Sequence, residues 1–228
     1  MSLGTDDKAG ANSEARARAA PGRRPAGEDT KQAILRAACK EFAAHGFSGA
    51  TVRAIGARAG VNHSMIKYYF QNKGLLWRAA VASLFRGLWG ALDFFNLERS
   101  GLSDLEIFKT FMRRYVRFCA EHPEFARIMV QENLSENDRV EWTALTFTKP
   151  GRTYMQPLFD RLRQAGHLPD IPRISFDYIF VASAQMMFVL APEVRRIWDY
   201  DPLTEQAIES HTEAMITLFL RDPPEPRA

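Results

Sequence analysis

Apolar residues recur at helical spacing along most of the chain. Ile34, Ala38 and Phe42 lie four residues apart, which places them on one face of a helix that begins near Thr30. Capping residues and glycines then mark further boundaries, with helix starts expected at Thr51, Asn62 and Asn72 and helix ends at Gly46 and Gly60. The pattern predicts a first helix, two short helices and a long fourth helix, whose apolar stripe comprises Val81, Leu84, Leu88, Leu92 and Phe95.

The part of the chain beyond residue 100 also shows helical spacing, without strand-like alternation. Pro123 suits the first turn of a helix, whereas Gly166, Pro169 and Pro192 are expected to end helices. We expect helices at about 105–119, 123–133, 138–147, 154–164, 174–190 and 204–220. The sequence therefore predicts an all-α protein.

The helical pattern stops at both ends of the chain. Residues 1–27 are rich in Ala, Gly, Ser and Arg, and residues 222–228 are rich in proline, so we expect both to be disordered. Between these tails we expect a small helical domain at 28–75 and a larger one at 76–221.

The net charge of +3 hides an asymmetry between two parts of the chain. Residues 1–80 contain 13 Lys and Arg against 6 Asp and Glu, a net charge of +7. Residues 81–228 contain 17 against 21, a net charge of −4. A basic segment of this kind suggests a polyanionic partner such as nucleic acid, and the alternative is a solvated basic face without a partner.

Several kinds of chemistry lack their usual sequence signatures. Cys39 and Cys119 are isolated, and the histidines show no metal-ligand spacing. Phosphate-binding, dinucleotide-binding and nucleophile-elbow motifs are missing. No apolar run reaches the roughly 18 residues of a membrane span. We therefore expect a cytoplasmic protein that is not an enzyme and that uses no metal, cofactor or membrane.

Two short helices joined through Gly60, Val61 and Asn62 form a predicted helix-turn-helix, since the glycine permits a sharp turn. The outward positions of the second helix carry hydrogen-bonding side chains, and a helix of this kind fits the major groove of DNA. These outward residues are His63, Ser64, Lys67 and Tyr68, and around them lie Thr51, Arg53, Arg58, Tyr69 and Lys73.

This segment resembles the DNA-binding domain of the TetR family of bacterial transcription regulators. The resemblance covers residues 30–81 and rests on ILRAACKEFAAHGF, TVRAIGARAGV, the YYF at the end of the short helix, and a lysine three residues after Phe70. It implies an N-terminal three-helix helix-turn-helix domain and a helical C-terminal domain for ligand binding and dimerisation.

The resemblance also implies roles for single residues. Five of them match positions that usually hold phosphates: Thr51, Arg53, Tyr68, Tyr69 and Lys73. We expect His63, Ser64 and Lys67 to contact base edges. The sequence departs from the family at Asn62–Ile66, Lys67, Tyr69 and Gly74, so the base-reading surface is this protein's own. Arginines 16, 18, 23 and 24 either enter the adjacent minor groove or belong to a solubilising leader.

The C-terminal domain should supply a two-fold dimer contact and a ligand pocket. Apolar positions on the last two predicted helices suggest an interface at Ile179, Met187, Ile208, Met215 and Phe219, unless segment 174–190 is only a core helix. Aromatic and methionine side chains suggest a pocket at Phe111, Tyr115, Met129, Trp142, Tyr154 and Met186, although ordinary cores have the same composition. Polar residues that could orient a ligand are Arg113, Glu132, Arg152 and Gln185.

Together these observations predict a transcriptional regulator that binds a palindromic double-stranded operator as a homodimer and is released by an unidentified small-molecule effector. Repression is favoured over activation, because a protein on the operator blocks polymerase without further contacts. The alternatives are a helical small-molecule-binding protein or an adaptor with a vestigial DNA-binding domain.

Overall fold

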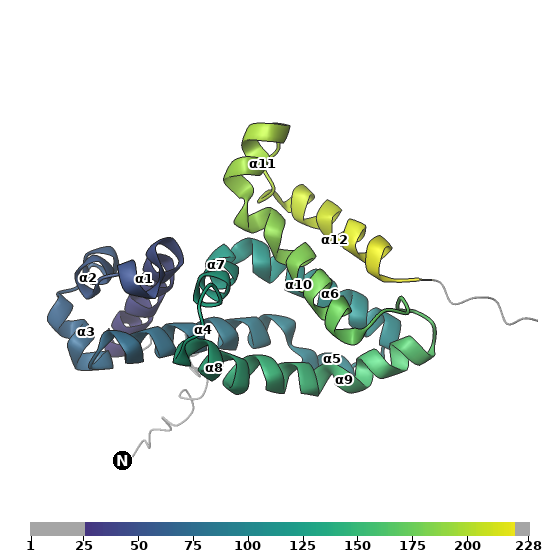
Figure 1. The fold of residues 1–228 in the computed structure, drawn as a ribbon, viewed down its shortest axis with the longest axis horizontal. Coiled ribbons are helices and arrows are strands. Elements are labelled where there is room, and N and C mark those ends of the chain that lie inside the picture. Colours follow the sequence, from purple (N-terminus) through teal and green to yellow (C-terminus); the bar gives the residue numbers. More distant parts are fainter. Residues whose placement is uncertain (1–25, 222–228) are drawn as a thin grey trace, which may run out of the picture.

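The computed structural model describes residues 26–221, and all its regular elements are helices (Figure 1). They are α1 (Ala26–Gly49), α2 (Val52–Ala59), α3 (His63–Phe70), α4 (Lys73–Leu92), α5 (Phe94–Glu98), α6 (Asp104–Glu121), α7 (Pro123–Glu132), α8 (Asp138–Thr143), the π-helical η1 (Ala144–Thr148), α9 (Lys149–Gln164), α10 (Arg173–Val189), α11 (Ala191–Trp198) and α12 (Glu205–Phe219). The prediction of an all-α protein is confirmed. The predicted tails and their four arginines lie outside these residues, except that α1 already includes residues 26 and 27.

The capping residues begin the helices that the sequence assigned to them. The side-chain oxygens of Thr51, Asn62 and Asn72 accept the backbone N–H groups of Ala54, Ser64 and Leu75 at 3.1, 3.0 and 2.9 Å. Gly60 ends α2 in the left-handed conformation, with φ 68°. Gly46 interrupts α1 with φ 66° and ψ 178°, a region open essentially only to glycine.

The fourth helix is shorter than its apolar stripe suggested. Asp93 adopts a left-handed conformation and accepts a hydrogen bond from the Asn96 side chain at 2.7 Å, which ends α4 and begins α5. As a result Phe94 is buried, whereas Phe95 is 54% exposed. The expected extension of the stripe through Phe95 is therefore wrong.

Two further boundaries differ from the sequence prediction. The expected gap between 147 and 154 is helical, because a π turn precedes Pro150 and the Lys149 N–H pairs with the Ala144 carbonyl five residues back. Pro192 does not end the helical region but occupies the first turn of α11, which the sequence analysis missed.

The first three helices lie at one end of the molecule, and α4 connects them to the rest (Figure 1). The expected domain boundary at 75/76 falls inside α4, which continues through it. Buried apolar side chains form one cluster that extends from Ile34 and Ile55 to Phe108 and Phe219. Helix α7 packs against α1, so the second part of the chain directly contacts the first.

Within residues 26–221, no single helix is both long and apolar enough to cross a membrane. Helices α10 and α11 meet that length and composition only as a pair, and they are bent by 69° at their junction.

Candidate nucleic-acid interface and internal cavity

Helices α2 and α3 pack closely because their contact residues are small or apolar. Ile55, Ile66 and Phe70 are buried beneath the turn. A Cβ atom at Gly56 would lie 3.0 Å from the Val61 carbonyl oxygen, so this close approach favours a glycine. The sequence pattern was interpreted through Gly60 alone. Gly56, four residues earlier, would also have indicated a close approach between the two helices.

The outward face of α3 consists of exposed polar side chains. His63, Ser64 and Lys67 are exposed, and Tyr68 is 78% exposed. Lys67 forms no ion pair within residues 26–221. The structure therefore leaves the three expected base-contacting residues on one accessible surface, and their contact with bases stays a prediction.

The start of α2 borders this surface. Thr51 is exposed, and its oxygen accepts the Ala54 N–H, which leaves the hydroxyl hydrogen available to a phosphate oxygen. Arg53 is exposed on the first turn of α2, where the helix dipole also favours an anion.

Lys73 is placed differently from the expected phosphate contact. It is half-buried, and its Nζ donates to the carbonyl oxygens of Ser48 at 3.4 Å and Ala50 at 3.1 Å. The same Nζ lies 4.6 Å from the centroid of the Phe47 ring. Lys73 thus joins the end of α1 to the start of α4. These partners lie more than 20 residues earlier in the chain, so the motif around Lys73 does not predict them.

Tyr69 is also partly covered. Its hydroxyl lies 3.3 Å from the position that a Cβ atom at Gly27 would occupy, close to the start of α1. Its ring contacts the edge of Tyr68 at a centroid distance of 5.2 Å. Of the two tyrosines, Tyr68 is the more accessible to DNA.

An ion pair, buried at Glu41 and exposed at Arg58, joins α2 to α1. The carboxylate of Glu41 accepts a hydrogen bond from Arg58 Nε at 2.9 Å, and Arg58 Nη2 lies 2.8 Å from the same oxygen. The Glu41 side chain is only 7% exposed, so its charge is held by this arginine. Arg58 is therefore already paired and is a weaker phosphate ligand than Arg53.

The segment between α3 and α4 is a tight γ-turn. Gln71 has φ 64° and ψ −55°, and the Asn72 N–H donates to the Phe70 carbonyl at 2.7 Å. A non-glycine residue in this conformation is strained, and such strain clusters at functional sites. The turn sets the angle between α3 and the long α4.

Besides α4, helices α7 and α8 join the end formed by α1, α2 and α3 to the rest of the chain. Gln131 Nε2 donates to the Ala43 carbonyl at 3.0 Å. Arg139 pairs with the buried Glu132 at 2.7 Å and lies 4.0 Å from the Phe47 ring centroid. A displacement of α7 would therefore be transmitted to the end of α1.

A cavity of about 480 Å³, partly open to solvent, lies on the other side of α7. Helices α4, α6, α7, α8, α9 and α10 contribute its walls, together with η1. Three of the residues predicted for the pocket line this cavity: Phe111, Tyr115 and Met129.

The other three predicted pocket residues lie elsewhere. Trp142 packs against Trp77 and Phe147, at ring-centroid distances of 5.8 and 5.3 Å. Tyr154 is 45% exposed and contacts Phe94, and Met186 is 41% exposed on the outer side of α10. Their aromatic or sulfur character did not reveal which side of a helix faces the cavity.

Two of the four predicted polar residues line the cavity, namely Arg152 and Gln185. The Gln185 side-chain amide donates to the Tyr115 hydroxyl at 2.7 Å, and burial raises the pKa of Tyr115 well above its usual range. The other two are engaged elsewhere, Arg113 with Glu213 at 3.1 Å and Glu132 with Arg139.

The two cysteines are buried thiols. Burial raises the pKa of Cys39 and that of Cys119 to about 12. Both are therefore protonated near neutral pH and are poor nucleophiles. Within the described part of the chain, no group of three or more His, Cys, Asp or Glu side chains could hold a metal ion.

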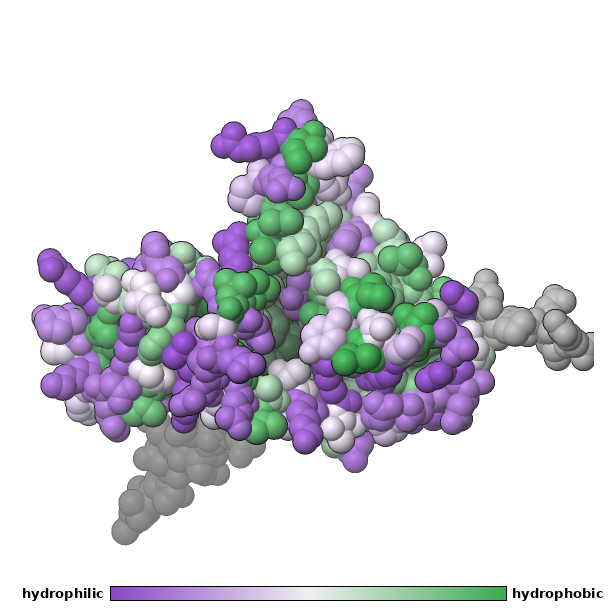
Figure 2. All heavy atoms as spheres, in the orientation of Figure 1, coloured by the Kyte–Doolittle hydropathy of each residue, from purple (hydrophilic) through white to green (hydrophobic). Residues whose placement is uncertain are grey.

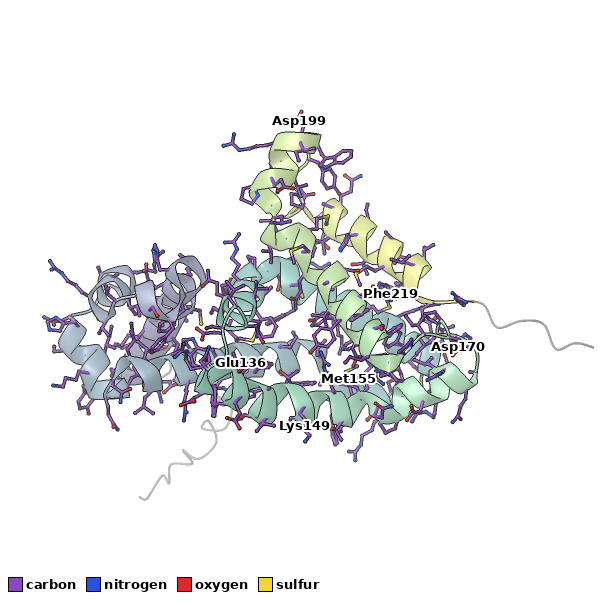
Figure 3. The ribbon with its side chains drawn as sticks, viewed as in Figure 1. Glu136, Lys149, Met155, Asp170, Asp199 and Phe219 are labelled. Carbon is purple, nitrogen blue, oxygen red and sulfur yellow. The ribbon has the colours of Figure 1, made fainter. Side chains whose placement is uncertain are left out.

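Three of the predicted dimer residues are already covered inside the chain. Ile208, Met215 and Phe219 face inward, and the Phe219 ring meets Phe176 and Phe180 at 5.5 and 5.4 Å (Figure 3). An apolar stripe has the same sequence pattern whether its cover comes from the same chain or from another, so the sequence alone does not separate the two cases.

The outer side of α10 instead presents an uncovered apolar stripe. Ile179 is 50% exposed, and Met187 is half-buried beside it. The other exposed residues are Ile174 at 65%, Met186 at 41% and Leu190 at 41%, whereas Tyr178, 60% exposed, lies at the cavity beside Arg152. Figure 2 shows hydrophobic side chains gathered along α10 and α11.

Known proteins share both the motif and the fold. Residues 34–80 match the family model described as bacterial regulatory proteins, tetR family. The chain is 27% identical over 160 residues to the HTH-type transcriptional repressor NicS of Pseudomonas putida, an alignment that covers 68% of this chain and 73% of that protein. It is 31% identical over 107 residues to the HTH-type transcriptional repressor SCO4008 of Streptomyces coelicolor, covering 47% of this chain and 51% of that protein.

The likeness of fold extends further than the likeness of sequence. A crystal structure of a TetR family transcription regulator from Marinobacter aquaeolei VT8 superposes with a TM-score of 0.62, covering 86% of this chain and 97% of that chain at 18% identity. The chain thus shares the helical architecture of that regulator well beyond the helix-turn-helix.

Proposed function

We propose that this chain, which belongs to the TetR family of bacterial transcriptional regulators, represses transcription as a homodimer on a palindromic operator and leaves the DNA when a small molecule fills its cavity. The chain is a DNA-binding transcriptional regulator. The proposal adds four properties: repression rather than activation, a homodimer, a palindromic operator and release by a small molecule. Binding alone accounts for this function in the cytoplasm, and no chemical step is required.

The observation that carries the proposal is the exposed face of α3. His63, Ser64, Lys67 and Tyr68 lie on this helix, which is supported from beneath by Ile66 and Phe70. Side chains on a helix that enters the major groove can reach base edges, while groups at the start of α2 hold the backbone. A vestigial domain would have no need of such an uncovered polar face.

A dimer supplies a second copy of the recognition helix α3. Two recognition helices must reach successive major grooves, about 34–36 Å apart on one face of the duplex. The stripe along α10 supports a two-fold contact, because it is apolar and uncovered in a single chain.

The placement of α7 supports control by a ligand. Its Phe125 and Met129 line the cavity, while its Gln131 and Glu132 form the contacts toward α1 described above. A ligand that moves α7 changes the distance between the two α3 helices of the dimer. By linkage, operator DNA must weaken ligand binding by the same factor.

Replacing Lys67 with alanine tests the assignment of α3 to DNA. We expect the affinity for the specific site to fall roughly 5- to 150-fold, because one base contact contributes about 1–3 kcal/mol. Affinity for unrelated duplex DNA should fall less, and fluorescence anisotropy with labelled duplexes at fixed salt measures both.

Arg163→Ala is the control, since it removes an exposed cation on α9 that is remote from α3 and pairs with Asp170. It should leave DNA affinity unchanged. Equal affinities for wild type and Lys67→Ala would show that α3 does not read the operator.

A further inference from the structure

The interior of the cavity fits an apolar ligand body. Most of its wall is aromatic or aliphatic, and its volume of about 480 Å³ is in the range of small-molecule sites. The aromatic lining residues are Phe85, Trp89, Phe111, Tyr115, Phe125, Phe147, Phe159, Tyr178 and Phe180. Its charged lining residues are Arg152, Arg173 and Asp177, whereas the buried polar pair of Tyr115 with Gln185 is uncharged and already hydrogen-bonded.

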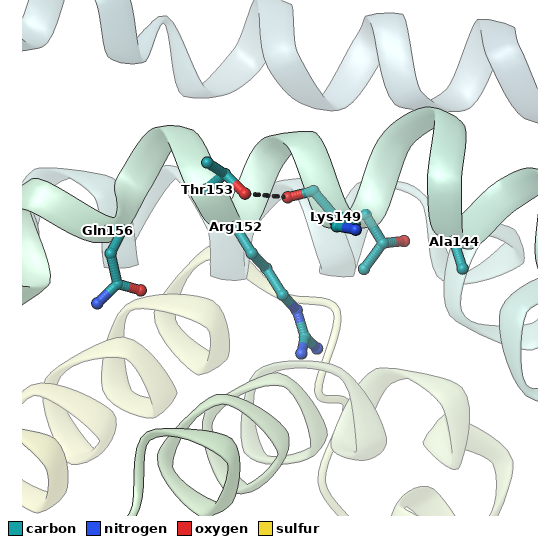
Figure 4. A pocket seen from close by; sticks show the side chains of 6 residues that line it. Ala144, Lys149, Arg152, Thr153 and Gln156 are labelled. Carbon is teal, nitrogen blue, oxygen red and sulfur yellow. Dashed lines mark hydrogen bonds between the residues drawn. The ribbon is translucent and has the colours of Figure 1, made fainter.

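A second depression, of about 380 Å³, adjoins the cavity on the outer side of α9 (Figure 4). It is lined by Ala144, Thr148, Lys149, Arg152, Thr153 and Gln156. Ala144, Thr148 and Arg152 line both spaces, so the two adjoin at these residues, and the outer depression is termed the mouth. Its lining contains two cations, Lys149 and Arg152, and Asp177 of the inner lining is the carboxylate that faces Arg152 at 3.8 Å.

Arg152 is the cation with unused hydrogen-bonding capacity. In Figure 4 it extends away from α9 toward the neighbouring helices. Its Nη1 lies 3.8 Å from Asp177 Oδ2, a long contact, and its guanidinium lies 4.7 Å from the Tyr178 ring centroid. A guanidinium held in this way can still offer parallel N–H groups to a carboxylate or a similar head group.

The neighbouring Arg173 neutralises Asp177 instead. Its Nε pairs with Asp177 Oδ1 at 2.7 Å, and its Nη1 donates to Gln156 at 3.0 Å. Its guanidinium also lies 3.7 Å from the Phe159 ring centroid. Because Arg173 is committed to these partners, Arg152 keeps a net positive charge for a ligand.

The backbone at the mouth is also unusual. The π turn η1 supplies Ala144 and Thr148, and single π turns inside helices are frequent at functional sites. Three residues after it, a Cβ atom at Gly151 would overlap the Trp89 ring. The glycine therefore lets Trp89 lie against α9 as part of the cavity wall.

We propose that the effector is an amphipathic organic anion, with its apolar body in the cavity and its anionic head group on Arg152 at the mouth. This inference rests on the proposed function in taking the cavity ligand to be the effector. The class is an apolar molecule with a single carboxylate or similar group, to which Lys149 adds long-range attraction.

Two fluorescent probes of nearly identical shape test the head-group site. Anilinonaphthalene sulfonate carries an anionic group, and phenylnaphthylamine has the same aromatic frame without it. We expect the wild-type chain to bind the sulfonate about tenfold more tightly, and Arg152→Met to abolish this preference while leaving binding of the neutral probe unchanged. Arg163→Met on the same helix is the control, since Arg163 pairs with Asp170 and lies outside both depressions.

Val181→Trp tests whether the probes occupy the cavity, because Val181 lines it. Both probes should lose affinity in this variant, with helical circular dichroism confirming that it folds. In the wild type, we expect octanoate to displace the bound sulfonate probe, whereas octanol, which lacks the carboxylate, should not displace it.

An unchanged sulfonate preference in Arg152→Met, or equal competition by octanol, would overturn the proposal. Probe binding that survives Val181→Trp would also overturn it, because the probes would then lie on the surface. These measurements contain no DNA, so their failure is distinct from a failure of operator binding in the Lys67 experiment.

Discussion

Replacing Trp77 with alanine will lower the free energy of unfolding by about 3–5 kcal/mol, the usual range for removing a buried aromatic ring. Trp77 is 0% exposed and lies on α4, where its ring meets Trp142 of α8 at 5.8 Å. The change leaves a cavity where the DNA-binding end joins the rest of the chain. Denaturant unfolding measures the loss, as a lower midpoint with an unchanged slope.

Trp77→Phe is the matched control for this prediction. The indole Nε1 of Trp77 is buried without a hydrogen-bond partner in the described structure, so phenylalanine keeps much of the packing and removes an unsatisfied donor. We expect a loss below about 1.5 kcal/mol. If alanine were no more destabilising than phenylalanine, Trp77 would not be part of the junction between the two regions.

In the proposed dimer, replacing Ile179 with glutamate is expected to separate the two subunits. In a two-fold interface the change occurs twice, and it places two carboxylates in an apolar contact. We expect the dissociation constant of the dimer to rise at least about a hundredfold, which corresponds to a loss of roughly 2.7 kcal/mol in association free energy. Operator affinity should fall with it, because each half-site is then bound singly. Sedimentation equilibrium and anisotropy measure the two effects.

Leu134→Glu provides a control at an equally apolar surface position. Leu134 is 79% exposed and lies between α7 and α8, away from α10. It should leave both the dimer and operator binding unchanged. A dimer that persists in Ile179→Glu would show that α10 does not form the subunit contact.

The local features of the fold were predictable from sequence because they depend on neighbouring residues. Thr51, Asn62 and Asn72 cap helices through N–H groups two or three positions away, and Gly60 needs only its own backbone conformation. The exposed polar face of α3 follows from the same local periodicity, with Ile66 and Phe70 setting the buried side.

The remaining features depend on partners that are distant in sequence. Lys73 is engaged by carbonyls of Ser48 and Ala50, which no motif around Lys73 reveals. The stripe on α12 is covered by α6 and α10 of the same chain, so Ile208 and Phe219 could not be told from interface residues. The positive charge at the mouth of the cavity depends on which arginine pairs with Asp177. Arg173 pairs with it at 2.7 Å and Arg152 only at 3.8 Å, and sequence spacing does not reveal this difference.

The measurement that tests the central claim most directly is the selection of duplexes from random double-stranded DNA by the purified chain at fixed salt. A DNA-binding dimer predicts an enriched inverted repeat, with half-site centres about 10–10.5 base pairs apart or a multiple of that spacing. Binding to this repeat should weaken steeply as salt rises, because several phosphates are neutralised together. The absence of any enriched sequence, or enrichment of a site without two-fold symmetry, would contradict the claim.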